Sequence, residues 1–104
     1  MTEFTSRVIA IIKSIPAGKV MTYGGIAACA GSPRGARNVV RVLHSMSEKH
    51  ALPWHRVINS KGQIGFADSE SRMLQTVSLE SEGVVIRNGV VDLSIYEFKG
   101  EDNG

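Results

Sequence analysis

The chain has 104 residues, which fits one domain that buries a core without disulfides or metals and excludes a two-domain enzyme. Hydrophobic residues make up 42% and charged residues 21%, which excludes a disordered or fibrous protein. The net charge of +2 hides an asymmetry, because residues 1–65 hold nine basic and two acidic residues, whereas residues 66–104 hold three basic and eight acidic ones. The basic part favours a polyanionic partner, or else a merely solvated basic surface, and the acidic part is expected to face away from that partner.

Membrane and metal-binding classes are disfavoured. The longest apolar runs, such as residues 8–12, are far shorter than the roughly 20 residues of a transmembrane helix. The chain opens without a basic and apolar leader, which favours a cytoplasmic location, at the nucleoid when bound to DNA. The single cysteine, Cys29, excludes an internal disulfide, and no His and Cys cluster has metal-ligand spacing. We therefore expect no metal and no other cofactor.

The first predicted elements are three helices. Apolar residues at helical spacing predict an amphipathic helix over residues 3–14, which ends before Pro16-Ala17-Gly18. Thr22 is a good N-cap for a short helix through Ala30, and Gly31 is placed to end it. Ser32 and Pro33 are suited to begin a second helix over residues 33–46, as its N-cap and its first residue. Two helices joined by a short turn containing Gly are typical of a helix-turn-helix.

The second of these helices is predicted to have one basic and one apolar face. A helical wheel puts Arg34, Arg37, Arg41 and His44 on one side, and Ala36, Val39, Val40, Leu43 and Met46 on the other. Residues 33–47 contain no acidic residue, whereas a solvated helix face usually mixes both signs. We therefore expect the basic face to contact nucleic acid and the apolar face to join the core.

The second part of the chain is predicted to add a helix and a hairpin. Residues 57–65 are expected to form either a small hairpin or a strand followed by a loop. Met73, Leu74, Val77 and Leu79 favour a helix over residues 69–82 that ends at Gly83. Asn88-Gly89 between two valine-rich runs is the clearest hairpin signal in the chain. Together the elements predict a single domain, mainly α with a small β hairpin, of the winged helix-turn-helix type.

Three motifs together resemble one known family. They are Gly18-Lys19-Val20-Met21-Thr22-Tyr23-Gly24, Ser32-Pro33-Arg34-Gly35-Ala36-Arg37-Asn38-Val39 and Pro53-Trp54-His55-Arg56-Val57. In this order and spacing the chain resembles the DNA-binding domain of the O6-alkylguanine-DNA alkyltransferases, and among them it is similar to the alkyltransferase-like proteins. The resemblance implies one such domain over residues 1–104, with a helix-turn-helix at about residues 22–46 and an active-site-like loop at residues 53–57.

The residue at the position of the family's acceptor cysteine decides the chemistry. The transferases read Pro-Cys-His-Arg-Val in this segment, and their cysteine takes the alkyl group from the damaged guanine. Here that position is Trp54, whose indole is neither nucleophilic nor readily deprotonated, so we expect no enzyme activity. Cys29, flanked by alanines, is expected to be a small buried side chain and not a substitute nucleophile.

The resemblance also implies roles for individual residues. Trp54, Tyr23, His55 and Val57 would line a pocket for the flipped base, while His55 and Glu82 would hydrogen-bond and orient the loop. Tyr23 would press on the phosphate and Arg37 would fill the gap left in the base stack. The remaining contacts, made through the minor groove, would come from Thr22, Ser32, Pro33, Arg34, Gly35, Ala36, Asn38, Arg41 and Arg56.

Simpler roles stay open for several of these residues. Tyr23 would also serve as a capping aromatic, and Arg37 as an ordinary phosphate contact. Arg56 is equally suited to brace the loop internally. Thr22, Ser32 and Asn38 are short polar residues near helix starts, where capping is the first explanation. Residues 65–70 stand where the transferases have a glycine-rich closing loop, and their acidic sequence carries over none of its contacts.

The implied function is that of a monomeric, non-enzymatic sensor of duplex DNA containing O6-alkylguanine. The protein would flip the lesion, shield it from alkyltransferases and flag it for nucleotide excision repair, whose damage-recognition proteins would be its partners. A sequence-reading winged-helix transcription regulator is the alternative, although it would need a dimerisation element or effector domain that the sequence does not show. An active alkyltransferase is disfavoured by the missing cysteine.

Overall fold

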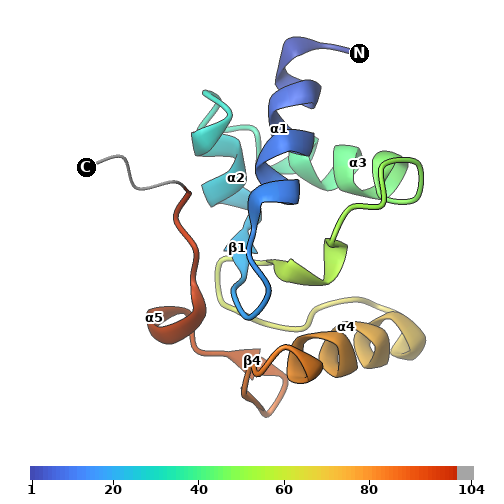
Figure 1. Ribbon diagram of the computed structural model, residues 1–104, viewed down its shortest axis with the longest axis vertical. Helices are drawn as coiled ribbons and strands as arrows, with labels where there is room; N and C mark the ends of the chain where they lie inside the picture. The colour runs from blue at the N-terminus through green and yellow to red at the C-terminus, as the bar shows by residue number, and fades with distance from the viewer. Residues whose placement is uncertain (101–104) are drawn as a thin grey trace.

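Three helices pack around the first of two hydrophobic cores in the computed structural model, which describes residues 1–100 (Figure 1). Helix α1 spans Glu3–Ser14, as predicted, and buries Val8, Ile9 and Ile12 against α2 (Tyr23–Cys29) and α3 (Ala36–Met46). The Thr22 hydroxyl accepts a hydrogen bond from the Gly25 N–H at 2.9 Å, which confirms Thr22 as the N-cap of α2. Helices α2 and α3 form the predicted helix-turn-helix.

The turn between α2 and α3 corrects the predicted start of the second helix. α3 begins at Ala36 instead of residue 33, and its N-cap is Gly35 instead of Ser32. Residues 32–35 form a tight turn in which the Gly35 N–H donates to the Ser32 carbonyl at 2.8 Å. Pro33 takes the second position of this turn, which its fixed φ fits as well as it fits a first helical turn. Gly31 has a φ of +88°, the left-handed conformation expected at the end of α2.

The buried face of α3 is rotated slightly from the predicted one. Val39 and Leu43 lie in the first core as expected, but Val42 is also buried and Val40 is 45% exposed. Val40 stood at the edge of the predicted apolar face, so a small rotation is enough to exchange it for Val42. The exposed Val40 then joins the surface that carries the candidate site.

A short parallel pair of strands links the two cores. Strand β1 (Met21–Thr22) pairs with β2 (Val57–Ile58), with Met21 opposite Val57. Met21 and Val57 point into the first core, whereas Ile58 lies in the second. Residues 57–65 are thus a strand followed by a loop and not a hairpin. A single turn of 3₁₀ helix, η1 (Trp54–Arg56), runs directly into β2.

The second core lies between α4 (Ser69–Ser81), the hairpin of β3 (Ile86–Arg87) and β4 (Val90–Val91), and the short α5 (Leu93–Tyr96). Its buried residues are Val20, Ile58, Leu79, Val84 and Val91. Asn88 and Gly89 have φ values of 54° and 71°, which confirms the predicted Asn-Gly turn. The wing of the winged helix-turn-helix is therefore this hairpin.

The sequence predicted α4 but not the face that it buries. Leu79 is fully buried together with Gln75, whereas Met73, Leu74 and Val77 are 67%, 51% and 58% exposed. The face of α4 that carries Gln75 packs on η1, so the apolar residues of the opposite face point into solvent.

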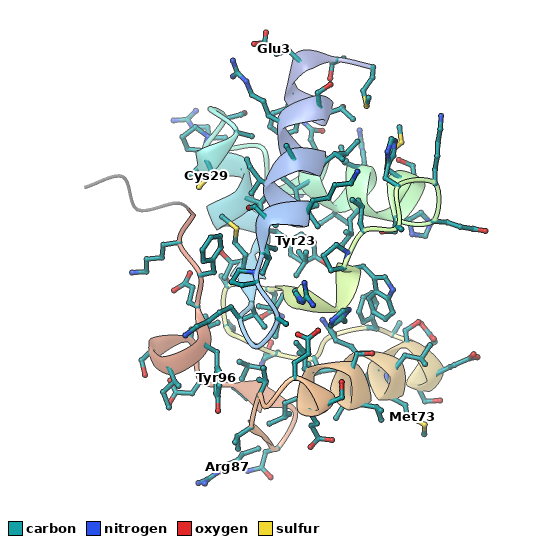
Figure 2. The ribbon with its side chains drawn as sticks, viewed as in Figure 1. Glu3, Tyr23, Cys29, Met73, Arg87 and Tyr96 are labelled. Atoms are coloured by element: carbon teal, nitrogen blue, oxygen red, sulfur yellow. The ribbon has the colours of Figure 1, made fainter. Side chains whose placement is uncertain are left out.

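Cys29 is exposed, which corrects its predicted burial. α2 packs through Ile26 and Ala27, so Cys29 on its other side points outward, with its Sγ 3.9 Å from the Lys99 carbonyl oxygen (Figure 2). Among the described residues, no helix has both the length and the apolar character needed to cross a membrane.

Candidate functional site

A partly buried ion cluster holds η1 in place. Glu82, the C-cap of α4, accepts from Arg56 Nη2 at 2.7 Å and from Arg56 Nε at 3.0 Å, and its Oε2 lies 2.8 Å from His55 Nε2. The Gly18 N–H donates to the same carboxylate, and Arg56 Nη1 donates to the Ile15 carbonyl at 2.9 Å. Of the two roles left open for Arg56, the structure shows the internal brace.

The Glu82 carboxylate is stabilised in its charged form. The hydrogen bonds from Arg56 lower the pKa of Glu82 to about 2, against the opposing effect of burial, and the bonds from His55 and Gly18 act in the same direction as Arg56. A carboxylate only accepts hydrogen bonds, so His55 Nε2 carries the hydrogen in this pair. His55 is therefore oriented by Glu82, as the loop-orienting pair was expected to be.

Gln75 is a second support for η1, and the sequence analysis missed it. Its side-chain Nε2 donates to the His55 carbonyl at 3.1 Å and to the Val57 carbonyl at 3.0 Å, and the residue is 1% exposed. These carbonyls belong to η1 and to the first residue of β2, directly after Trp54, so a residue of α4 holds η1 on the core. The signal available in the sequence was a polar residue, Gln75, between the apolar residues Leu74 and Val77 of the predicted helix.

We expect Gln75→Met to lower the free energy of unfolding by about 2 kcal/mol, because two enclosed carbonyls lose their donor. The methionine keeps the volume, so the loss reports on hydrogen bonding. Urea titration followed by circular dichroism measures it, with Gln63→Met on the exposed loop as the control. Equal stability of the two variants would show that Gln75 does not hold η1.

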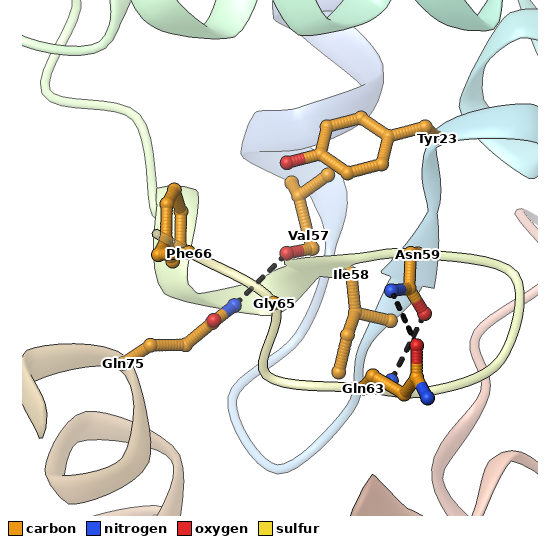
Figure 3. A pocket seen from close by; sticks show the side chains of 8 residues that line it. All are labelled: Tyr23, Val57, Ile58, Asn59, Gln63, Gly65, Phe66 and Gln75. Carbon is orange, nitrogen blue, oxygen red and sulfur yellow. Dashed lines mark hydrogen bonds between the residues drawn. The ribbon is translucent and has the colours of Figure 1, made fainter. Parts of the chain in front are cut away.

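Two adjoining hollows lie beside this loop and share Tyr23 and Phe66. The smaller one, of about 120 Å³, is lined by Val57, Ile58 and Gln75 and, from the following loop, by Asn59, Gln63 and Gly65 (Figure 3). The Tyr23 hydroxyl reaches across it above Val57, and burial raises the pKa of that hydroxyl. The outer hollow, of about 250 Å³, is lined by Tyr23, Val40, Leu43, His44, Ser47, Trp54, Phe66 and Ser71.

Aromatic rings form the wall between the loop and the outer hollow. Trp54 packs edge-to-face on Phe66, with ring centroids 5.6 Å apart, and edge-to-face on His55 at 6.4 Å. Arg72 holds the segment that carries Phe66 by donating to the Phe66 and Ala67 carbonyls, both at 2.7 Å. Phe66 was missed because it lies in the stretch that departs from the family pattern. Of the predicted pocket residues, Tyr23, Trp54 and Val57 line the hollows, whereas His55 stands behind Trp54.

The basic residues predicted to contact DNA are exposed, except for Arg56. Arg34, Arg37, Asn38 and Arg41 are exposed on the turn and on α3, beside Pro33 and the half-buried Ser32 and Ala36. Thr22 is buried and occupied as the cap of α2. Gly35 is buried too. A Cβ at this position would lie 3.0 Å from the Ser32 carbonyl oxygen and 3.2 Å from the Phe4 ring, so close packing already explains why the residue is a glycine. Of the acidic residues, Glu101 and Asp102 lie outside the described residues.

Comparisons with known proteins agree with this geometry. Residues 3–84 match the model of the 6-O-methylguanine DNA methyltransferase DNA-binding domain. The chain is 43% identical over 97 residues to the DNA base-flipping protein of Escherichia coli, covering 92% of this chain and 74% of that one. It is 44% identical over 87 residues to alkyltransferase-like protein 1 of Schizosaccharomyces pombe, covering 83% and 81%.

A solved structure extends the likeness to the whole fold. The crystal structure of S. pombe Atl1 in complex with damaged DNA containing O6-carboxymethylguanine superposes with a TM-score of 0.84 at 39% identity, over 95% of this chain and 97% of that one. The chain therefore belongs to the family of the 6-O-methylguanine DNA methyltransferase DNA-binding domain, together with relatives named DNA base-flipping and alkyltransferase-like proteins.

Proposed function

We propose that this protein is a non-enzymatic sensor that binds O6-alkylguanine in duplex DNA, flips the damaged base and holds it. The observation that carries the proposal is the position of Trp54, at the wall of a hollow shared with Tyr23 and Phe66, in front of an intact His55–Glu82 pair. Cys29, the one cysteine in the chain, lines neither hollow. The site thus combines an aromatic receptor with no thiol to accept an alkyl group.

The helix-turn-helix supplies the DNA contacts in this proposal. Arg34 and Arg41 neutralise phosphates, and α3 enters the minor groove. Arg37 fills the gap left by the flipped base and Tyr23 presses on the neighbouring phosphate. Extruding a base costs a few kcal/mol and costs less for a lesion that already weakens its pair, so selectivity begins before the pocket is reached. The names of the E. coli and S. pombe relatives, and the damaged DNA in the S. pombe structure, support this assignment.

A lesion held without repair has two consequences. It is hidden from a transferase that needs the same extruded base, so the protein competes with active alkyltransferases. It also persists as a marked site, and we propose that damage-recognition proteins of nucleotide excision repair are recruited to it. The protein acts as a monomer in this scheme.

The test compares two duplexes of one sequence, with guanine and with O6-methylguanine at the same position, at one stated salt concentration. We expect tighter binding to the damaged duplex and, after long incubation, no alkylated peptide by mass spectrometry. Equal affinity for both duplexes, with a preference among undamaged sequences, would support a transcription regulator instead. A stoichiometric adduct on any residue would make the protein an enzyme.

Arg37→Ala is expected to weaken binding to the damaged duplex by at least about 1 kcal/mol, the scale of one charge-assisted contact. Arg34→Ala, on the turn, is the matched control because it removes the same charge. If Arg37 fills the base stack, its variant loses more affinity for damaged than for intact DNA, whereas Arg34→Ala weakens both alike. Fluorescence anisotropy with both duplexes separates the two patterns. If Arg37→Ala loses equal affinity for damaged and intact DNA, Arg37 is only a phosphate contact.

A further inference from the structure

The outer face of α4 carries an unpartnered apolar stripe. Met73, Leu74 and Val77 are each more than half exposed, and their spacing of three and four residues puts them side by side on one face. Figure 2 shows Met73 pointing out from α4, away from the rest of the molecule. The opposite face of the helix, with Gln75 and Leu79, already packs on η1 and the second core. More than half of each residue in the stripe therefore stays uncovered in this fold.

Acidic side chains stand at both ends of the stripe. Glu70 lies one turn before Met73 and Leu74, Glu80 lies one turn after Val77, and both are exposed. The one basic residue of α4, Arg72, is turned to the Phe66 and Ala67 carbonyls. The face is thus apolar in the middle and negative at its ends, without a neighbouring cation on the same helix.

The apolar centre and the negative ends of this face distinguish three candidate binding partners: a DNA strand, a second copy of the chain and a helix of another protein. A DNA strand is excluded by the two carboxylates, which would face phosphates. A second copy of the chain pairing through α4 would put carboxylate against carboxylate in both the parallel and the antiparallel arrangement. A helix with an apolar stripe and lysine or arginine at its edges matches both the apolar centre and the charges.

We propose that α4 is a docking face for a basic amphipathic helix of a partner protein, anchored by Met73, Leu74 and Val77. The Gln75 face of α4 packs on η1 below α3 (Figure 1), so the stripe on the opposite face points away from η1. The inference rests on α4 alone and stands whether or not the protein senses alkylated guanine.

The experiment uses two labelled model peptides, one with a leucine stripe edged by lysine and one with glutamate in place of every lysine. Fluorescence anisotropy measures their binding to the wild-type protein, to Leu74→Ser/Val77→Ser, and to Val85→Ser as the control at an exposed valine outside α4. We expect the lysine peptide to bind at least about tenfold more tightly than the glutamate peptide, and the double variant to lose about tenfold in affinity. The control should bind as the wild type does.

Backbone amide shifts in an NMR titration locate the contact. Shifts confined to residues 69–81 and to segments packed on them support the docking face, as does a reversed peptide preference in Glu70→Lys/Glu80→Lys. Equal binding of both peptides, an unaffected double variant, or shifts centred on α3 would overturn the proposal. So would a loss of DNA affinity in the double variant, because the stripe would then belong to the DNA interface.

Discussion

Replacing Glu82 by glutamine is expected to lower the free energy of unfolding by about 2 kcal/mol at neutral pH. Removing one member of an enclosed ion pair leaves the other charge without its partner, and here Arg56 and His55 both lose the carboxylate. The Glu82 side chain is 14% exposed and those of His55 and Arg56 are 19% exposed, so some solvent screening reduces the loss below that of a fully buried pair. The same change leaves the Gly18 N–H with a neutral amide oxygen as its acceptor, so this bond loses its charge assistance.

The pH dependence gives this prediction a second readout. Because the folded protein lowers the pKa of Glu82 from 4.5 to about 2, its stabilising effect is complete above about pH 4.5 and is lost as the pH falls through about 2. The stability gap between wild type and Glu82→Gln should therefore narrow steadily across that range. The pKa of Asp68 is lowered by the hydrogen bonds that its carboxylate accepts from Ser71. Its stabilising effect is therefore also lost in acid, but equally in the wild type and in Glu82→Gln, so it leaves the difference between the two proteins unchanged.

Urea unfolding at a series of pH values measures the gap, with Glu80→Gln as the control because Glu80 is on the same helix but exposed. That control should differ from the wild type by at most about 0.5 kcal/mol at each pH. If the difference in unfolding free energy between wild type and Glu82→Gln stays constant down to about pH 2, the charge of the Glu82 carboxylate does not stabilise the cluster.

Local signals in the sequence were sufficient for α1, α2 and α4 and for the wing, but not for the short α5. Thr22, Gly31 and Asn88-Gly89 act within a few residues of themselves, so their structural effects follow from their own conformational preferences. The start of α3 was misplaced because Ser32 and Pro33 suit a tight turn and a helix start equally well. Strand β1 was missed because two residues acquire a strand conformation only through a partner far along the chain.

The site shows the same division between local and distant determinants. The segment of residues 53–57 and Glu82 were identified from motif positions, and the structure brings His55, Arg56 and Glu82 together. Gln75 and Phe66 were missed because their roles depend on carbonyls and rings supplied by other segments. The exposed side of α4 was missed for a related reason: spacing shows that a helix has an apolar face but not that a polar face is the buried one.

The second large effect is expected at Trp54. Stacking of a base on an aromatic side chain contributes about 1–3 kcal/mol, so Trp54→Leu should reduce the preference for O6-methylguanine over guanine by roughly tenfold to a hundredfold. Leucine still covers the first core, against which Trp54 packs, and the fold should survive. Affinity for intact DNA should change by less than about twofold, because in the proposed binding mode phosphate contacts on α3 provide it.

Trp54→Cys asks whether the remaining cluster makes a transferase. A thiol at this position would stand beside His55, which Glu82 already orients. We expect little transfer, because Trp54 and Phe66 form one packed wall and a small thiol in its place leaves the alkyl carbon without a fixed approach. Mass spectrometry after incubation with O6-methylguanine DNA detects the adduct, and stoichiometric transfer would show that Trp54 alone separates this protein from the enzymes.

Phe66→Leu distinguishes a specific role of Trp54 from a general loss of aromatic surface. Both rings line the outer hollow, but only Trp54 stands on η1, between that hollow and His55. If Trp54 is the stacking partner, Trp54→Leu loses more selectivity for damaged DNA than Phe66→Leu does. Phe66→Leu should lose only part of the selectivity, because it removes the ring that packs edge-to-face on Trp54. Competition binding with damaged and intact duplexes in one solution measures the ratio directly. Unchanged selectivity in Trp54→Leu would show that the damaged base does not bind in this hollow. Equal losses of selectivity in Trp54→Leu and Phe66→Leu would show that both rings, and not the indole alone, bind the base.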